Sequence, residues 1–152
     1  MKIMFVCHGN ICRSPMAEFV MKEMLKKTGF SKNVFVASSA TSTEEIGNPV
    51  HSGTVKKLLE FGISTEGKYA VRFTKEDYAN YDYIIGMDTW NVKNLLRMVG
   101  GDPDEKIYKL LDFAGGGDIA DPWYTGNFDD TYDDVVRGCK GLMKRVRKQV
   151  IR

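Results

Sequence analysis

Short apolar runs alternate along the chain with longer segments whose apolar residues recur at helical spacing. The apolar runs predict strands at residues 2–7, 34–37, 81–87 and 107–111. The longer segments predict helices at residues 15–27, 50–61, 89–98 and 129–150, with a weaker segment at 75–79. Strands that alternate with helices form a parallel sheet through right-handed crossovers. The pattern therefore predicts an α/β doubly wound fold with helices on both faces of the sheet.

Residues typical of helix ends mark the first two predicted helices. Ser14 stands where an N-cap belongs, and Pro15 follows at the first helical position. Gly29 and Gly62 follow the two helices, where glycine tolerates the left-handed backbone of a C-terminal cap. We therefore expect a short loop after the first strand, and the first helix to begin at Ser14.

The composition is that of one globular domain, which we place at residues 1–152. Hydrophobic residues make up 43% of the chain and charged residues 28%, which is ordinary for a globular protein. The 22 Lys and Arg nearly balance the 20 Asp and Glu, giving a net charge of +2. This near balance of positive and negative side chains argues against a nucleic-acid or membrane partner. We expect a monomer.

Cysteine usage and the N-terminal residues indicate the compartment. Three cysteines, an odd number, do not make a disulfide framework, so we expect a reducing, cytoplasmic setting. The first apolar run lacks the long apolar region and cleavage site of a signal peptide. No stretch approaches the roughly 20 apolar residues that span a bilayer. In a reducing setting, a cysteine invites a catalytic or redox explanation.

The run VCHGNICRSP, residues 6–15, joins the first predicted strand to the first predicted helix. Gly9 and Asn10 tolerate unusual backbone angles, so the loop can turn its N–H groups toward one point. The helix N-terminus behind the loop adds the positive end of its dipole. Ligands of α/β sheets bind outside the carboxyl ends of the strands. These features predict a cradle for an oxyanion such as phosphate or vanadate.

Cys7 is the first residue of this cradle, and the donors that hold an oxyanion also stabilise its thiolate. A helix dipole stabilises the thiolate by only about 0.3–2 kcal/mol. Further stabilisation of the thiolate must therefore come from Arg13, the loop amides and the Ser14 hydroxyl. The planar guanidinium of Arg13 can bind two phosphoryl oxygens at once. We predict that the thiolate attacks phosphorus and forms a phosphocysteine, which water then hydrolyses. The alternative for Cys7 is a small buried hydrophobe at a strand end.

The segment VCHGNICRSPMAE resembles the signature of the low-molecular-weight protein tyrosine phosphatase family. Further similar segments are Ser38-Ser39-Ala40, MDxxN from Met87, LLDF from Leu110 and DPWY from Asp121. The resemblance implies a single-domain, three-layer, Rossmann-like sandwich around a four-stranded parallel sheet of order 2-1-3-4. It also implies hydrolysis of phosphotyrosine without a metal ion or another cofactor.

The same resemblance assigns the general acid to Asp121. Pro122 restricts the residue before it to extended backbone, which places this carboxylic acid on a stiff loop. Asp121 would protonate the leaving oxygen and then act as base on the attacking water. The alternative is that Asp121 only shapes a turn.

Other family positions map onto the supports of the cradle. Asn10 and Ser39 resemble residues that hold the phosphate loop through hydrogen bonds. Ser14 resembles the hydroxyl that eases the departure of the cysteine. A family histidine that braces the loop has no counterpart in the matching stretch 65–68. We therefore expect the bracing of Asn10 to differ from that of relatives.

Aromatic residues beside the acid indicate an aromatic substrate. Trp123 and Tyr124 would stack on the ring of phosphotyrosine or another aryl phosphate. Glu45 stands where the family often has an aromatic residue, which would favour basic residues beside the phosphotyrosine. Relatives that hydrolyse phosphoarginine carry threonine at the position of Ile11, so Ile11 also favours tyrosine. The predicted substrate-binding residues are His8, Gly9, Asn10, Ile11, Cys12, Ser14, Glu45, Trp123 and Tyr124.

Two loop residues keep two interpretations each. His8 either faces the solvent or, when protonated, tunes the thiolate. Cys12 is either a tightly packed small residue or a resolving thiol that pairs with oxidised Cys7.

Two other classes of protein use a similar cysteine. A phosphocysteine carrier of the sugar-transport type needs neither Arg13 nor a late general acid. An arsenate reductase of this architecture relays through a cysteine pair near the third helix, and residues 84–101 contain no cysteine. Both therefore fit the chain less well than a phosphatase.

Overall fold

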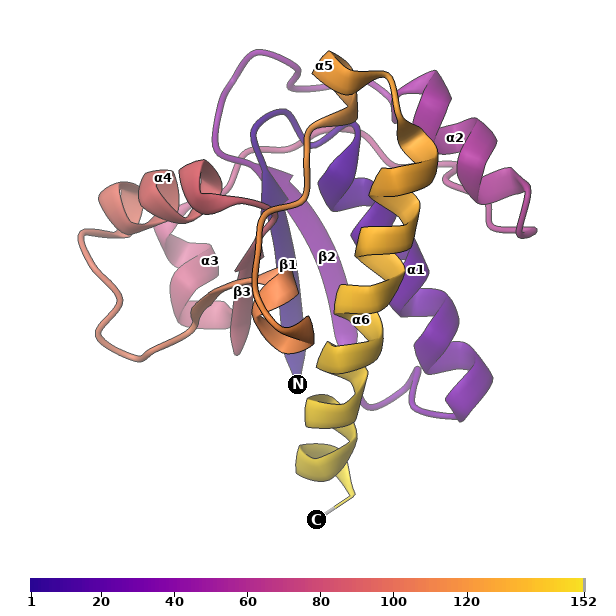
Figure 1. Ribbon diagram of the computed structural model, residues 1–152. Coiled ribbons are helices and arrows are strands. Elements are labelled where there is room, and N and C mark those ends of the chain that lie inside the picture. Colours follow the sequence, from indigo (N-terminus) through magenta and orange to yellow (C-terminus); the bar gives the residue numbers. More distant parts are fainter. Residues whose placement is uncertain (152) are drawn as a thin grey trace.

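Four parallel strands form one sheet in the computed structural model, which describes residues 1–151 (Figure 1). The strands are β1 (Lys2–Cys7), β2 (Phe35–Ala40), β3 (Tyr83–Gly86) and β4 (Ile107–Lys109). Their order across the sheet is β2-β1-β3-β4, which confirms the predicted fold class. β4 is shorter than expected because Leu110–Ala114 turn into a 3-10 helix, η1.

Six α-helices accompany the sheet in residues 1–151. They are α1 (Arg13–Thr28), α2 (Ser52–Leu59), α3 (Lys75–Asn80), α4 (Thr89–Val99), α5 (Pro122–Thr125) and α6 (Phe128–Val150). The sequence did not predict α5, since four residues are too short to show helical periodicity. None of the helices described in this part of the chain is long and apolar enough to cross a membrane.

The central strand β1 is buried on both of its faces. Ile3 and Phe5 pack with residues of α1 and α6 in the larger hydrophobic cluster. Met4 and Val6 point the other way, into a smaller cluster with residues of α3 and α4. Successive side chains of a strand alternate between faces, so one apolar run supplies both cores. Figure 1 shows α1 and α6 on one side of the sheet and α3 and α4 on the other.

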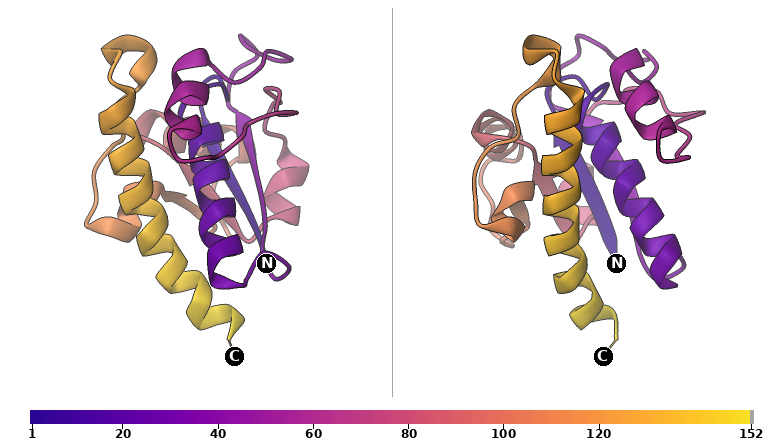
Figure 2. Two further views of the ribbon diagram at one scale, coloured as in Figure 1. Left: turned by 90° about the vertical axis from the view of Figure 1, so that its right-hand side faces the viewer. Right: turned by 45° about the vertical axis from the view of Figure 1, so that its right-hand side comes forward.

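The topology places several loops at one end of the sheet. The chain leaves β1 toward β2 on one side, whereas β3 lies on the other side of β1. Such a switch in direction opens a crevice at the carboxyl end of the central strand. Figure 2 shows that α5 and the N-terminal ends of α1 and α2 all lie at this end of the molecule.

The loop before α5 is held against this end of the sheet. Ile119 donates a 3.0 Å backbone hydrogen bond to the carbonyl of Met87, just beyond β3. The other end of this segment is fixed through η1, which packs closely on α6. A Cβ atom at Gly138 would overlap the Leu110 side chain. The glycine therefore permits the close approach that sets the path of residues 115–121.

Candidate active site

The loop after β1 turns sharply before it enters α1. Asn10 has a φ of 59°, in the left-handed region that asparagine tolerates better than most residues. The helix begins at Arg13, with Cys12 in the N-cap position and no side-chain capping bond. The prediction of Ser14 as the N-cap was therefore wrong. Its hydroxyl is instead engaged with side chains of the loop.

Cys7 Sγ lies at the centre of this loop and contacts two hydrogen-bond donors. Ser14 Oγ is 3.0 Å from Cys7 Sγ, and the Asn10 backbone N–H donates to the same sulfur at 3.3 Å. The Asn10 side-chain amide donates to Ser14 Oγ at 2.8 Å, so the hydroxyl proton of Ser14 is directed at the sulfur or at the more distant Ser39 carbonyl, 3.5 Å away. Donors aimed at sulfur stabilise the thiolate over the thiol.

The Asn10 side chain is itself fixed on both ends. Its Oδ1 accepts from the Val71 N–H at 3.1 Å, and its Nδ2 donates to Ser38 Oγ at 2.9 Å. Ser38 Oγ in turn donates a hydrogen bond to the buried carboxylate of Glu18, at 2.6 Å. Each of these hydrogen bonds has one possible donor and one acceptor, so the core behind the loop fixes the orientation of the Asn10 side chain.

Ser39 contacts the loop through its backbone carbonyl, which accepts from Ser14 Oγ at 3.5 Å. Its hydroxyl donates to Met4 Sδ at 3.3 Å, so the hydroxyl that supports Asn10 is that of Ser38. Alternation along β2 explains this difference. Ser38 shares its face with Val36, which packs in the cluster containing α1 residues, whereas Ser39 faces the opposite way.

Arg13 is buried, and its guanidinium has three partners. Nη1 donates to Asp88 Oδ2 at 2.6 Å and to the Ile119 carbonyl at 2.9 Å, while Nη2 lies 3.4 Å from Asp121 Oδ2. Burial alone would lower the pKa of Arg13. The negative charges of Cys7, Asp88 and Asp121 outweigh burial and raise it above its ordinary value. The guanidinium is therefore a fixed cation beside the sulfur.

Asp88 was not among the predicted site residues. It is the N-cap of α4, where its Oδ1 accepts from the Asn91 N–H at 2.8 Å. Its other oxygen binds Arg13. The MDxxN segment contained the signal, since an aspartate three residues before asparagine is typical of a helix start. What the pattern could not give is that the second oxygen reaches another helix.

Asp121 lies at the mouth of the loop, as the N-cap of α5. Its Oδ1 accepts from the Trp123 N–H at 3.0 Å. Pro122 occupies the first helical position, where its missing N–H costs nothing. A capping bond and a proline thus hold the carboxylate in place, one oxygen tied to its own helix and the other facing Arg13.

These groups line one cavity of about 110 Å³. Its walls are formed by Cys7, His8, Gly9, Ile11, Cys12, Arg13, Glu44, Glu45, Asp121, Trp123 and Tyr124. The structure therefore gathers most of the predicted site residues around one space. Asn10 and Ser14 do not line the cavity but lie buried behind it, where they orient Cys7. Glu44 was not predicted, because it lies on a surface loop without a recognisable pattern.

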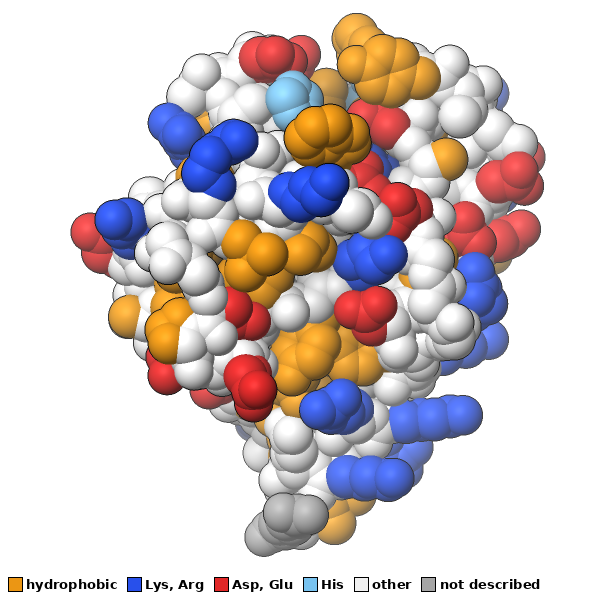
Figure 3. Space-filling model, turned by 60° about the vertical axis from the view of Figure 1, so that its left-hand side comes forward, with side chains coloured by type: hydrophobic (Ala, Val, Ile, Leu, Met, Phe, Trp, Pro, Cys, Tyr) orange, Lys and Arg blue, Asp and Glu red, His pale blue; other side chains and the backbone are white. Residues whose placement is uncertain are grey.

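The rim of the cavity carries both aromatic and acidic side chains. Trp123 is 57% exposed and Tyr124 is 83% exposed, so neither belongs to the hydrophobic core. Figure 3 shows hydrophobic, acidic and histidine side chains together at the top of the molecule. Within residues 1–151 there is no group of three or more His, Cys, Asp or Glu side chains that could hold a metal ion.

A model of the family described as low molecular weight phosphotyrosine protein phosphatase matches residues 2–152. YfkJ of Bacillus subtilis, a low molecular weight protein-tyrosine-phosphatase, is 38% identical over 150 residues, 97% of this chain and 96% of YfkJ. The chain belongs to the low molecular weight phosphotyrosine protein phosphatase family. This assignment confirms the resemblance and the prediction of a hydrolase.

Several solved structures have the same fold. The crystal structure of YfkJ matches with a TM-score of 0.95 at 37% identity, covering 98% of this chain and 96% of YfkJ. SP-PTP, the low molecular weight protein tyrosine phosphatase of Streptococcus pyogenes, matches with a TM-score of 0.85 at 46% identity, covering 95% and 91%. Wzb of Vibrio vulnificus, in complex with benzylphosphonate, matches with a TM-score of 0.84 at 26% identity, covering 95% and 97%.

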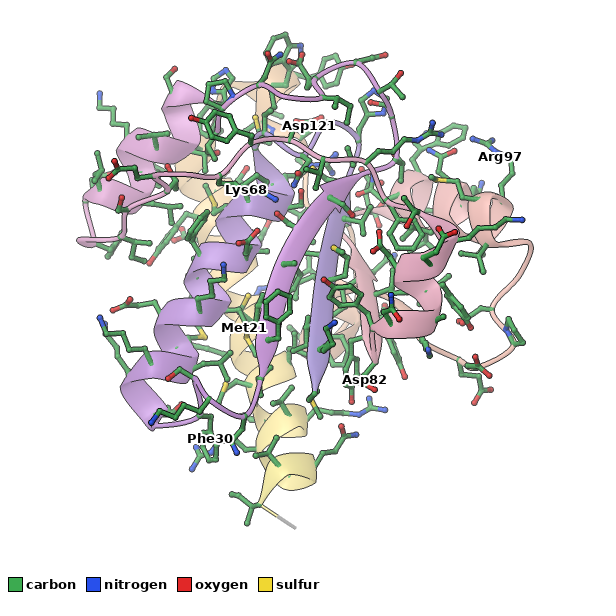
Figure 4. All side chains as sticks on the ribbon, turned by 180° about the vertical axis from the view of Figure 1, so that it is seen from behind. Met21, Phe30, Lys68, Asp82, Arg97 and Asp121 are labelled. Atoms are coloured by element: carbon green, nitrogen blue, oxygen red, sulfur yellow. The ribbon has the colours of Figure 1, made fainter. Side chains whose placement is uncertain are left out.

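In this phosphatase, Lys68 supports the loop from behind. Lys68 Nζ donates to the Ser38 carbonyl at 2.8 Å and lies 3.6 Å from Glu18 Oε1. Burial lowers the pKa of Lys68, against the opposing effect of the Glu18 charge. Figure 4 shows Lys68 at the same end of the molecule as Asp121. Lys68, in the stretch 65–68, thus contacts Ser38 and Glu18, the two residues behind the Asn10 side chain.

His8 points along the rim of the phosphatase cavity. Its Nε2 lies 2.9 Å from Glu44 Oε2, and about half of its side chain is exposed. No hydrogen bond joins the described His8 ring to Cys7. The geometry therefore favours the solvent-facing interpretation, with an acidic neighbour that would hold the ring when it is protonated.

Cys12 is buried in the wall of the same cavity. Burial, and next the negative charge of Cys7, raise the pKa of Cys12 to about 12. Cys139 is fully buried in the core beside α1, and burial raises its pKa as well. Of the three sulfurs, Cys7 alone has donors aimed at it from both a hydroxyl and a backbone amide.

Proposed function

We propose that this protein hydrolyses protein phosphotyrosine through a phosphocysteine intermediate on Cys7, with Arg13 binding the phosphoryl oxygens and Asp121 as general acid and base. One observation carries the proposal. Cys7 and the fixed cation of Arg13, from the loop after β1, line one cavity together with the carboxyl group of Asp121, which comes from a distant segment of the chain. A nucleophile, a charge stabiliser and a proton donor are the parts that phosphoryl transfer requires.

In the first step the Cys7 thiolate attacks phosphorus. The sulfur–phosphorus bond forms as the bond to the tyrosine oxygen breaks, and Asp121 transfers its proton to that oxygen. Arg13 and the loop amides carry the charge of the other phosphoryl oxygens, so the proposed reaction uses no metal ion. Asp88 and the Ile119 carbonyl hold the guanidinium in position for this role.

In the second step water attacks the phosphocysteine, and Asp121 takes one of its protons. The oxygen–phosphorus bond forms, the sulfur–phosphorus bond breaks, and phosphate leaves. The departing sulfur regains a full negative charge. The Ser14 hydroxyl, 3.0 Å from Cys7 Sγ, supports that charge with a hydrogen bond, which makes Cys7 a better leaving group.

The aromatic rim supports an aryl substrate. Trp123 and Tyr124 stand on the side of the cavity that also carries Asp121, where they can flank the ring of a phosphotyrosine. Ile11 adds an apolar surface within the cavity. Benzylphosphonate, found in the complex of Wzb, joins a phosphoryl group to an aromatic ring in a similar way.

The proposal also places the protein in a reducing compartment, since Cys7 must remain a thiolate to act. We propose the cytoplasm, and a monomer that acts on its substrate without nucleic acid or a membrane. Phosphate or vanadate would occupy the loop as an inhibitor.

Hydrolysis assays test the proposed function. Wild-type protein should hydrolyse p-nitrophenyl phosphate and a phosphotyrosine peptide, with inhibition by vanadate. Cys7→Ser should abolish turnover of both. A protein without turnover would contradict the proposal, and stable phosphorylation of Cys7 by a phosphodonor without hydrolysis would indicate a carrier instead.

A further inference from the structure

A second hollow opens beside the catalytic cavity. The two share Ile11, Glu45 and Trp123 as a common wall. The second hollow, which we call the side groove, is broader, about 700 Å³ against about 110 Å³. Its lining is Ile11, Glu45, Asn48, Pro49, Val50, His51, Ser52, Val55, Lys56, Leu59 and Trp123. None of the proposed chemical steps uses it.

The floor and far wall of the side groove are mainly apolar. Val55 and Leu59 are four residues apart on α2 and so share one face of that helix. Leu59 is 58% exposed, so its apolar side chain faces the groove and not the core. Pro49 and Val50 extend the apolar surface toward Ile11. Figure 2 shows α2 beside α5 in both views. The lining residues come from these two helices, the loop before α2 and Ile11 of the loop after β1.

His51 fixes the side groove to the phosphate loop. Its backbone N–H donates to the Ile11 carbonyl at 2.8 Å. Its ring packs edge-on against Trp123, with ring centroids 5.6 Å apart, and stacks on Phe128 at 5.2 Å. The groove is therefore already formed in the protein, and His51 links its wall to the catalytic loop.

The charges around the side groove do not select one sign. Glu45 and Lys56 are its charged side chains, and they are opposite in sign. His51 Nδ1 accepts a 3.0 Å hydrogen bond from the Gly53 N–H, which leaves this nitrogen occupied by helix capping. Recognition in the groove must therefore come mainly from apolar contact.

We infer that the side groove is a substrate subsite that binds an apolar side chain next to the phosphotyrosine. The inference rests on the proposed function. A peptide whose phosphotyrosine enters the catalytic cavity leaves it over the shared wall of Ile11, Glu45 and Trp123, and one flank then lies along the groove. A second copy of the chain on the groove would cover Trp123 and Glu45 and close the catalytic mouth, so we assign the groove to the substrate.

Apolar contact in the side groove should act on binding rather than on chemistry. It is the same in the ground state and in the transition state, so it lowers KM and leaves kcat unchanged. Replacing alanine by leucine in the peptide, at the flanking position that reaches the groove, should raise kcat/KM about tenfold. A gain of this size is within the range for apolar pockets. A contribution to kcat would indicate a different role.

A set of phosphotyrosine peptides tests the inference. Each peptide has alanine on both flanks except for one leucine, placed in turn at positions −3 to +3, and phosphate release gives kcat and KM. For wild type, one flank should show the leucine preference through KM. The double variant Val55→Thr, Leu59→Gln should reduce the ratio of leucine to alanine peptides to about one. Leu96→Gln, an exposed leucine of α4 on the other side of the sheet, is the matched control and should keep the preference.

The outcomes separate the subsite from the proposed function. Wild type that hydrolyses p-nitrophenyl phosphate but shows no leucine preference at any position would overturn the subsite alone. A preference that persists in the double variant would do the same. Loss of a dimer in the double variant during size-exclusion chromatography would assign the groove to a second copy instead. Absence of p-nitrophenyl phosphate turnover in wild type would overturn the proposed function and, with it, the subsite.

Discussion

Arg13 Nη1 donates a 2.6 Å hydrogen bond to Asp88 Oδ2, and this contact joins the start of α1 to the start of α4. The two helices lie on opposite faces of the sheet, so the ion pair crosses the end of the central strands. It holds the guanidinium beside Cys7 before any substrate arrives. Arg13 is thus positioned in advance for the phosphoryl oxygens, which is how an enzyme lowers the cost of orienting charge.

The Asp88→Asn variant should lose catalytic efficiency while keeping its helix. Asparagine caps a helix as well as aspartate does, so α4 stays formed. The loss of the negative charge frees the guanidinium, and misplacement of such a group by about 1 Å can cost about a hundredfold in rate. We expect kcat/KM for p-nitrophenyl phosphate to fall about tenfold to a hundredfold, with weaker inhibition by phosphate. The exposed Asp104→Asn is the control and should behave as wild type.

Replacing the general acid should have an effect that depends on the leaving group. Asp121→Asn cannot protonate the departing oxygen, and a general acid contributes about 10²- to 10⁴-fold. The loss in kcat/KM, which reports the first step, should be large for a phosphotyrosine peptide, since tyrosine is a weak acid with a pKa of about 10. It should be smaller for p-nitrophenyl phosphate, whose leaving phenol is more acidic. Steady-state kinetics with both substrates measures the difference.

Asp118→Asn is the matched control for this experiment. Asp118 lies three residues before Asp121 in the same loop but pairs with Lys109, at 2.9 Å. Its variant should retain the activity of wild type on both substrates. Equal losses in kcat/KM on the two substrates in Asp121→Asn would contradict proton transfer from Asp121 to the leaving oxygen.

The three thiols should differ in their reaction with iodoacetamide. The pKa of Cys12, about 12, leaves only about one thiolate in ten thousand at pH 8, and its thiolate fraction rises only as the solution becomes strongly alkaline. Cys139 is fully buried, and burial raises its pKa too. Peptide mapping after labelling at pH 7.5 should therefore find Cys7 modified first, and phosphate should slow the reaction. Equally fast labelling of Cys12 would show that its surroundings are misassigned.

The sequence could predict those features of the site that are set by residues close together in the chain. Cys7, Arg13 and the turn between them lie in one short run, so residue types and spacing within that run were enough to predict roles for them. Asp121 was predicted from its resemblance to the D-P motif of the family, in which proline follows the acid. These are properties that neighbouring residues impose on each other.

The contacts that sequence analysis missed come from distant segments. Asp88 was recognisable as a helix cap, but its second oxygen binds Arg13, 75 residues away. Lys68 reaches the Ser38 carbonyl from a loop without regular structure. Ser38 itself could have been distinguished from Ser39, since alternation along the strand puts it on the face of Val36.

Cys12 should protect the enzyme from irreversible oxidation. Peroxide converts the Cys7 thiolate to a sulfenic acid, which removes the negative charge that helps to raise the pKa of Cys12. The Cys12 sulfur can then attack, forming a Cys7–Cys12 disulfide and releasing water. After peroxide treatment, dithiothreitol should restore most of the activity of wild type and of Cys139→Ala, but little of the activity of Cys12→Ser. Full recovery of Cys12→Ser would rule out this protective role.

The phosphocysteine itself is the most direct test of the mechanism. The Cys7 thiolate, with Ser14 and the Asn10 amide directed at it, is the proposed nucleophile. Wild-type protein mixed with a phosphotyrosine peptide, quenched in acid within milliseconds and digested, should yield a phosphorylated peptide that contains Cys7, detected by mass spectrometry. The same peptide should be absent after quenching of Cys7→Ser. Turnover by wild type without this species, or a phosphoryl group on another residue, would contradict the mechanism.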